Sequence, residues 1–160
     1  MKRKVYVETS VISYLTARPI RTILGAAHQQ ITLAWWEQRE AYELLISEAV
    51  LRECAAGDPD AAQKRLNAVA DLPMLLIEEP ALHIAEGLVE QGIVPAKAAE
   101  DALHIAVATV YGVDYLLTWN CRHIANPEMQ RGIAAYLSRI DLYLPFICTP
   151  EELLGEENAE

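Results

Sequence analysis

Short apolar runs alternate along the chain with longer segments in which apolar residues recur at every third or fourth position. The short runs favour buried strands, whereas the wider spacing is typical of helices with one buried face. Four or five strands follow from this pattern, the last of them at an edge of the sheet. The expected strands span residues 5–7, 42–46, 74–77, 114–118 and 146–149.

Residues that favour helix starts separate these strands. Thr9 or Ser10 is placed to cap a helix over residues 11–15, and Asp58 followed by Pro59 is a typical helix start. Other helices are expected over residues 22–39 (one long or two short), 47–54, 58–71, 80–92, 98–112 and 127–139. Helices between successive strands predict one α/β domain over residues 1–149, with a central, mainly parallel sheet flanked by helices on both faces.

The composition indicates a globular, acidic protein. Of the 160 residues, 52% are hydrophobic and 22% charged, and no apolar run approaches the ~20 residues of a membrane span. The three cysteines are scattered, as in a reducing compartment, so we expect a cytoplasmic protein. The net charge is -10, partly from residues 150–160, which we expect to form a solvated, frayed tail. Proteins that bind nucleic acid over their whole surface are usually basic, so any such contact is local or depends on bound metal ions.

Four polar residues interrupt the apolar pattern at informative places. Glu8 and Asn120 follow the first and fourth strands, and α/β sheets bind ligands at the carboxyl ends of their strands. Glu53 and Asp101 lie on helices that can lean over the same edge. Clustered carboxylates repel one another unless a cation neutralises them, and oxygen ligands suit Mg²⁺ or Mn²⁺. Such a site activates water and stabilises the charge on a phosphodiester during cleavage.

The segments around these residues resemble the four motifs of PIN-domain ribonucleases, in the same order along the chain. In that family the first motif is a strand that ends in an acid followed by Thr or Ser, the second is a helix with a characteristic Glu, and the last is a strand that ends in Thr-x-Asp. The matching segments are VYVETSVI (5–12), SEAVLRE (47–53), DALHIAVA (101–108) and YLLTWN (115–120). The resemblance extends over residues 4–149.

This resemblance implies a metal-dependent endoribonuclease, most often the toxin of a bacterial VapC-type toxin–antitoxin pair. It implies RNA as the substrate, a cognate antitoxin protein as a partner, and a homodimer. Carried over by position, Glu8, Glu53 and Asp101 hold Mg²⁺ or Mn²⁺, Thr9, Ser10 and Thr118 orient ligands or water, and Asn120 occupies the fourth acidic position. Two positions depart from the family pattern: Glu8 is one methylene longer than the usual Asp, and Asn120 carries no charge. The expected site therefore has three carboxylates rather than four.

Other interpretations stay open at this point. The main alternative is a module that kept the fold and binds RNA or a protein partner without cleaving, while the charge alone favours an acidic adaptor. His104, one turn beyond Asp101, is either a buried histidine with satisfied hydrogen bonds or a general base. The spacing of Cys54, Cys121 and the histidines does not match a zinc finger or ribbon. No Gly-rich phosphate loop is present, which excludes nucleotide hydrolysis by that route.

Overall fold

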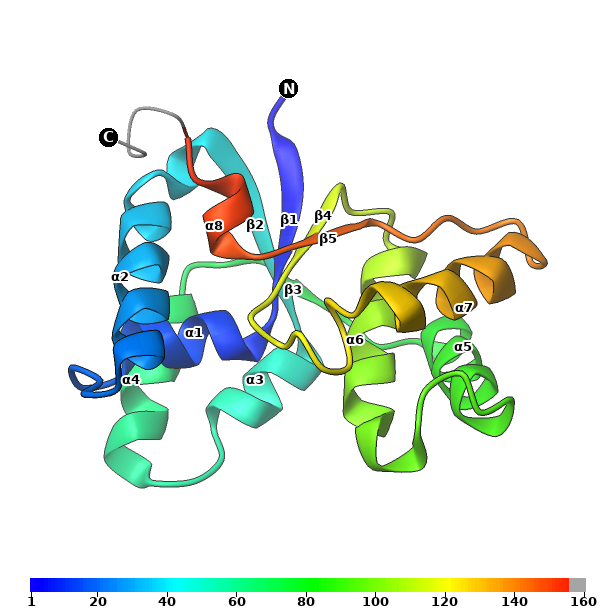
Figure 1. Ribbon diagram of the computed structural model, residues 1–160, viewed down its shortest axis with the longest axis horizontal. Helices are drawn as coiled ribbons and strands as arrows, with labels where there is room; N and C mark the ends of the chain where they lie inside the picture. The colour runs from blue at the N-terminus through cyan, green and yellow to red at the C-terminus, as the bar shows by residue number, and fades with distance from the viewer. Residues whose placement is uncertain (156–160) are drawn as a thin grey trace.

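A computed structural model describes residues 1–155 as a five-stranded sheet with helices packed around it (Figure 1). The strands are β1 (Arg3–Val7), β2 (Tyr42–Ser47), β3 (Met74–Leu75), β4 (Tyr115–Leu117) and β5 (Phe146–Cys148). The helices are α1 (Thr9–Thr16), α2 (Ile23–Glu37), α3 (Glu48–Cys54), α4 (Pro59–Val69), α5 (Glu79–Glu90), α6 (Ala99–Val110), α7 (Pro127–Ser138) and α8 (Pro150–Leu153), with short 3-10 turns at Arg39–Ala41 and Ala96–Ala98.

The sheet has the strand order β3-β2-β1-β4-β5, and every neighbouring pair is parallel. The chain builds outward from β1 to β3 on one side, then returns to β4 beside β1 and builds outward to β5. The order therefore changes direction between β1 and β4. In open parallel sheets, the carboxyl ends of the two strands at such a point leave a crevice for ligands. The predicted α/β class and the parallel sheet are confirmed.

Helices cover both faces of this sheet. Figure 1 shows α1, α2 and α4 together on one side of the strands and α5, α6 and α7 on the other. The last residues of β1 (5–7) and β4 (116–117) are buried, as is the α6 segment from Ala102 to Thr109. The burial of this segment accounts for its Ala-rich composition, because small side chains allow a close approach of neighbouring elements. No helix in residues 1–155 is long and apolar enough to cross a membrane.

Most predicted elements occur where the pattern placed them, with two informative differences. The third strand stops at Leu75 rather than at residue 77, because the Ile77 N–H donates to the Glu48 carboxylate (2.8 Å) instead of to a neighbouring strand. The expected frayed tail is wrong for its first residues. Pro150–Leu153 form α8, which begins with a capping box between Thr149 and Glu152 and packs Leu153 against the core. Residues 156–160 of the predicted tail lie outside the described part of the chain, and the boundary of the domain at 149 stays a prediction.

Candidate metal centre

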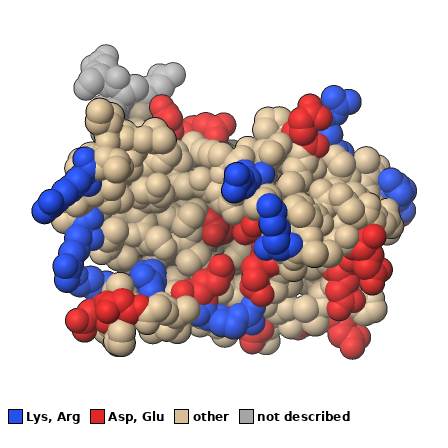
Figure 2. All heavy atoms as spheres, turned by 60° about the horizontal axis from the view of Figure 1, so that its bottom comes forward, with Lys and Arg blue, Asp and Glu red and all other residues tan. Residues whose placement is uncertain are grey.

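The candidate site lies at the point where the strand order changes direction. Glu8 directly follows β1, and its backbone N–H donates to the Leu117 carbonyl at the end of β4 (3.0 Å). Thr118 directly follows β4, so both residues stand at the same edge of the sheet. Figure 2 shows the face on which this edge opens: acidic side chains gather around its middle, with Lys and Arg beside them and further Lys and Arg towards the left and right edges. The sheet topology thus brings together two of the four predicted motifs.

Glu8 is held in place by hydroxyl and amide donors. Its Oε1 accepts hydrogen bonds from the hydroxyls of Ser10 and Thr118 (2.6 Å for Thr118), and its Oε2 accepts one from the Ser10 N–H (3.1 Å). Only 5% of the residue is exposed. Glu8 is therefore the N-cap of α1, and the prediction that Thr9 or Ser10 caps this helix is wrong. The carboxylate takes the cap because it also satisfies the donors that come from β4, which a Ser or Thr hydroxyl cannot do.

Glu53 and His104 form a charged pair beside Glu8. Glu53 extends from α3, and its Oε1 accepts a hydrogen bond from the Thr9 hydroxyl (2.9 Å) and is also the partner of His104 Nε2. Burial alone would raise the pKa of Glu53, but the hydrogen bonds and charge of His104 together with the Thr9 hydroxyl lower it. Burial alone would lower the pKa of His104, but Glu53 and the nearby charges of Glu8 and Asp101 raise it. Each member of the pair thus favours the charged form of the other, and the pair links α3 to α6.

A buried hydrogen-bond chain supports His104 from behind. The Tyr6 hydroxyl lies 2.7 Å from His104 Nδ1 and 2.7 Å from Ser47 Oγ. All three side chains are fully buried, and the Tyr6 ring meets the His104 ring edge to face. Burial, the largest cause, raises the pKa of the Tyr6 hydroxyl far above its ordinary value, so that it stays protonated. Both ring nitrogens of His104 are thus hydrogen bonded, which confirms the interpretation of a buried, satisfied histidine.

Asp101 and Asn120 are engaged elsewhere. The Asp101 carboxylate pairs with His123 Nδ1 (3.2 Å) and is partly exposed. Asn120 Oδ1 accepts hydrogen bonds from the N–H groups of Arg122 (3.2 Å) and His123 (3.0 Å), which fixes the loop after β4. An Asn side chain that bonds the backbone two and three residues ahead is a common turn-forming arrangement. The same loop thereby positions His123 against Asp101, so the third and fourth predicted site residues are linked through one histidine.

The side chains that could hold a cation are those of Glu8, Glu53 and His104. One ligand atom from each lies within 4.8 Å of the other two, and no such group among residues 1–155 includes Asp101. Two carboxylates beside an imidazole form a donor set that fits a divalent cation. The predicted trio of Glu8, Glu53 and Asp101 is therefore brought to one edge of the sheet, but His104 lies closer to the two glutamates than Asp101 does.

Sequence reasoning placed His104 beside the site without assigning it to the group. A signal was available, because His104 lies three residues after Asp101 and helix positions three apart share a face. The supporting residues Tyr6 and Ser47 could not have been found this way. They are separated from His104 by 98 and 57 positions in the sequence and meet it only through the sheet.

The two largest of the hollows described lie outside this centre. A cleft of about 570 Å³ runs beside α1 and α4 and is lined by Ser13, Thr16, Arg18, Asp58, Asp60, Lys64 and Arg65 among others. Its α1 residues belong to the second half of the helix that Glu8 caps at its start. A second pocket, of about 610 Å³, lies at the amino end of β2, away from the carboxyl-end edge.

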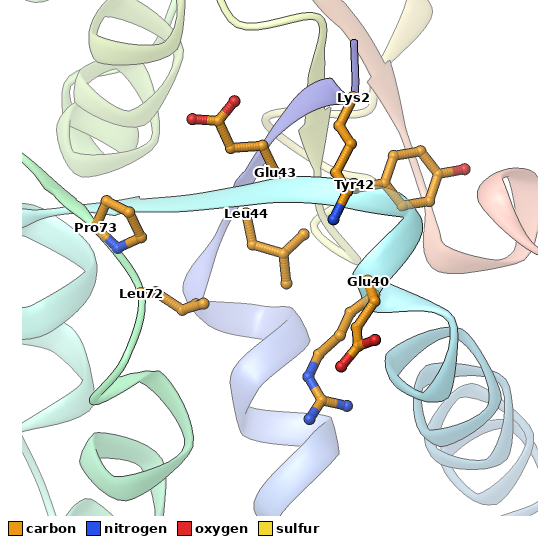
Figure 3. A pocket seen from close by; sticks show the side chains of 8 residues that line it. Lys2, Glu40, Tyr42, Glu43, Leu44, Leu72 and Pro73 are labelled. Atoms are coloured by element: carbon orange, nitrogen blue, oxygen red, sulfur yellow. The ribbon is translucent and has the colours of Figure 1, made fainter.

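The pocket at the amino end of β2 lacks a cluster of catalytic groups. Figure 3 shows Leu44 and Leu72 pointing into it, Lys2 and Glu40 on its margin, and Glu43 pointing away on the other side of the strand. Its charged side chains are spread around an apolar floor rather than converging on one point. The carboxyl-end edge of the sheet is therefore the better candidate for chemistry.

Comparisons with known proteins agree with the fold. No family model matches the chain, and no curated protein sequence is significantly similar to it. Among solved structures, the chain is similar to one from the crystal structure of VapBC2 from Rickettsia felis bound to a DNA fragment from their promoter. The TM-score is 0.53 at 14% sequence identity, over 91% of this chain and 98% of that one. The chain accordingly has the fold of the PIN-domain, VapC-type proteins that its four motifs resemble.

Proposed function

We propose that this chain is a divalent-metal-dependent endoribonuclease and the toxin of a toxin–antitoxin pair. The observation that carries the proposal is the meeting of Glu8 and Glu53 at the carboxyl-end edge of the sheet, where hydroxyl donors hold both carboxylates in place. The VapC-type fold supports the same assignment. We propose Mg²⁺ or Mn²⁺ as the cofactor, because carboxylate oxygens make up most of the donor set.

In this proposal the protein supplies orientation and charge. Thr118 and Ser10 hold Glu8, with the Ser10 N–H on its Oε2, and Thr9 holds Glu53 Oε1. A carboxylate oxygen has two lone pairs, so these contacts orient both carboxylates and still leave lone pairs for a cation. When bound, a divalent cation offsets the charge on phosphate oxygens and promotes ionisation of an attacking water. Asp101 adds a third carboxylate on the exposed side of the centre, where it can orient that water. Asn120 contributes by fixing the loop that carries His123.

The cleft beside α1 is the proposed path of the RNA strand. Arg18 and Lys64 are exposed on its two walls, and Ser13 and Thr16 line the α1 side between them and the acidic centre. Lys and Arg bind phosphate oxygens through charge, independently of base sequence. Three cations, Arg18, Lys64 and Arg65, and two acids, Asp58 and Asp60, line the cleft, so it is less acidic than the chain as a whole, whose net charge is -10.

The partners follow from the same proposal. The structural neighbour is a VapBC2 complex, which supports an antitoxin protein as the partner of this chain. We also propose a cytoplasmic homodimer. Sedimentation at micromolar concentration tests the dimer: a single species of twice the 17.8 kDa chain mass is expected, and a clean monomer contradicts it.

Cleavage of a mixed-sequence RNA tests the activity. The wild-type protein, Glu53→Gln and Asp101→Asn are each assayed in Mn²⁺, in Mg²⁺ and in EDTA. Glu43→Gln, on the exposed start of β2, is the control for removal of a charge. We expect cleavage that needs a cation, is reduced at least about a hundredfold in Glu53→Gln, and is unchanged in the control. Cleavage that persists in EDTA and in Glu53→Gln contradicts the proposal. RNA binding by folded wild-type protein without any cleavage supports the non-catalytic module instead.

A further inference from the structure

His104 occupies a place in the candidate centre that neither the carboxylate motifs nor the net charge predicts. Its side chain is fully buried, and its Nε2 faces the Glu53 carboxylate, on which the Thr9 hydroxyl also converges. A histidine buried this deeply cannot reorient towards solvent, so its Nε2 is committed to whatever occupies the space beside Glu53 and Glu8. In this structure Nε2 is hydrogen bonded to the Glu53 carboxylate.

The hydrogen bond at the other ring nitrogen, Nδ1, resembles the one that metal-binding histidines make. Such a histidine donates its second N–H to a fixed acceptor, which sets the tautomer and leaves the other nitrogen free to bind the metal. Here the Tyr6 hydroxyl lies 2.7 Å from Nδ1 and can accept that hydrogen while donating its own to Ser47 Oγ, 2.7 Å away. Ser47 is in turn fixed as the N-cap of α3, the helix that carries Glu53.

The charges around His104 favour a cation at its Nε2. Glu8 and Glu53 both have a carboxylate oxygen within 4.8 Å of it, and Asp101 lies one helical turn away on α6. A divalent cation can take the place of the contact between Nε2 and Glu53, because both carboxylates attract a cation. The resulting donor set would contain one nitrogen and two carboxylates.

We propose that His104 Nε2 is a direct ligand of the catalytic cation together with Glu8 and Glu53, an inference that rests on the proposed function. The mixed nitrogen–oxygen set then selects a first-row transition ion, such as Mn²⁺, over Mg²⁺. Mg²⁺ prefers an octahedron of oxygen atoms and retains several waters, whereas imidazole nitrogen favours the softer transition ions. His104 thus compensates for the missing fourth carboxylate at Asn120 by adding a neutral nitrogen donor.

Metal binding to the intact protein tests this inference without relying on activity. Mn²⁺ and Mg²⁺ are titrated calorimetrically into the metal-free wild-type chain, His104→Gln and His83→Gln, the last a control on the exposed surface of α5. We expect the wild type and the control to bind Mn²⁺ more tightly than Mg²⁺. In His104→Gln, the affinity for Mn²⁺ should fall at least about tenfold. Loss of a residue that only hydrogen bonds to a metal ligand already lowers metal affinity by about that factor, and loss of a ligand should lower it more. Equal Mn²⁺ affinity in His104→Gln and the control overturns the inference.

A second measurement needs no variant at this buried position and therefore does not depend on His104→Gln folding. Pulsed electron paramagnetic resonance of Mn²⁺ bound to the wild-type chain detects a directly coordinated imidazole nitrogen, and we expect that signal. Bound Mn²⁺ without nitrogen coupling overturns the inference and leaves the proposed metal-dependent nuclease intact. No binding of either ion by the folded wild type at millimolar concentration instead overturns both.

Discussion

Replacement of Tyr6 by Phe removes one hydroxyl that is the partner of two buried polar atoms, of which only Ser47 Oγ keeps another contact, to the Val50 N–H. The hydroxyl lies 2.7 Å from both His104 Nδ1 and Ser47 Oγ, and all three residues are fully buried. A buried polar group that loses its hydrogen bond lowers the free energy of unfolding by about 1–3 kcal/mol. Part of this loss is offset, because the variant no longer has to bury the Tyr6 hydroxyl. We therefore expect Tyr6→Phe to lower the free energy of unfolding by about 2–4 kcal/mol.

Urea unfolding followed by circular dichroism and tryptophan fluorescence measures this change, provided that the denaturant dependence of the free energy is the same in both proteins. Tyr143→Phe is the matched control, because Tyr143 is 88% exposed and the same atom is removed there. The control should remain within about 0.5 kcal/mol of the wild type. If Tyr6→Phe also remains within that margin, the Tyr6 hydroxyl does not support His104.

A double-mutant cycle with Ser47→Ala identifies the cause. The single Ser47→Ala variant loses both the partner of Tyr6 and the side-chain cap of α3, which is worth about 0.5–2 kcal/mol. In the double variant no Ser47 hydroxyl is left unpaired, so the destabilisation should be about 1 kcal/mol smaller than the sum of the single effects. Simple additivity would show that the two hydroxyls do not interact.

Three further predictions concern the surface and the loop of the site. Burial raises the pKa of the Cys54 thiol to about 11 and that of the Cys148 thiol to about 12. At pH 8 a thiol reagent should therefore modify only the exposed Cys121. Two or more fast-reacting thiols in the native protein would contradict this. Lys64→Gln should weaken RNA binding and reduce the slope of log affinity against log salt by about 0.7–1, whereas an unchanged slope measured by fluorescence anisotropy places the RNA elsewhere. Asn120→Asp keeps the oxygen that accepts hydrogen bonds from the loop N–H groups, so thermal stability should change little. The added charge should raise the affinity for Mn²⁺. An unfolding temperature more than about 5 °C below that of the wild type would show that the loop needs the amide.

The order of strands and helices could be predicted from the sequence because it depends on local patterns. Alternating apolar runs and helix starts predicted a parallel sheet, and all five strands begin and end within two residues of the expected positions. The end of β3 is shortened by a contact between Glu48 and Ile77 that no local pattern encodes. The cap of α1 was mispredicted for a similar reason. Local preference favours Ser or Thr, but Glu8 also satisfies the Thr118 hydroxyl, which lies 110 positions away in the sequence.

The site could be predicted only in part. The motifs indicate which residues lie at the edge of the sheet, but they do not indicate which side chain each of these residues contacts. Motif spacing placed Glu8, Glu53 and Asp101 at one edge of the sheet. It could not assign the partners that come from distant elements: Thr118 for Glu8, His104 for Glu53 and His123 for Asp101. The hydrogen bonds of Ser10 to Glu8 and of Asn120 to the loop after it join residues two or three positions apart, so they could have been predicted from the sequence.

The pairing of the acids explains how a metal-free chain can keep them together. Glu8 receives donors from Ser10 and Thr118, Glu53 is paired with His104, and Asp101 is paired with His123. Each carboxylate thus has its own compensating group, so the fold does not require a cation to overcome mutual repulsion. A cation that binds must displace some of these contacts, which lowers its affinity relative to a site of four unpaired acids. Weak ion binding would then restrict activity to conditions in which a suitable transition ion is available, and the calorimetric titration of Mn²⁺ measures that affinity directly.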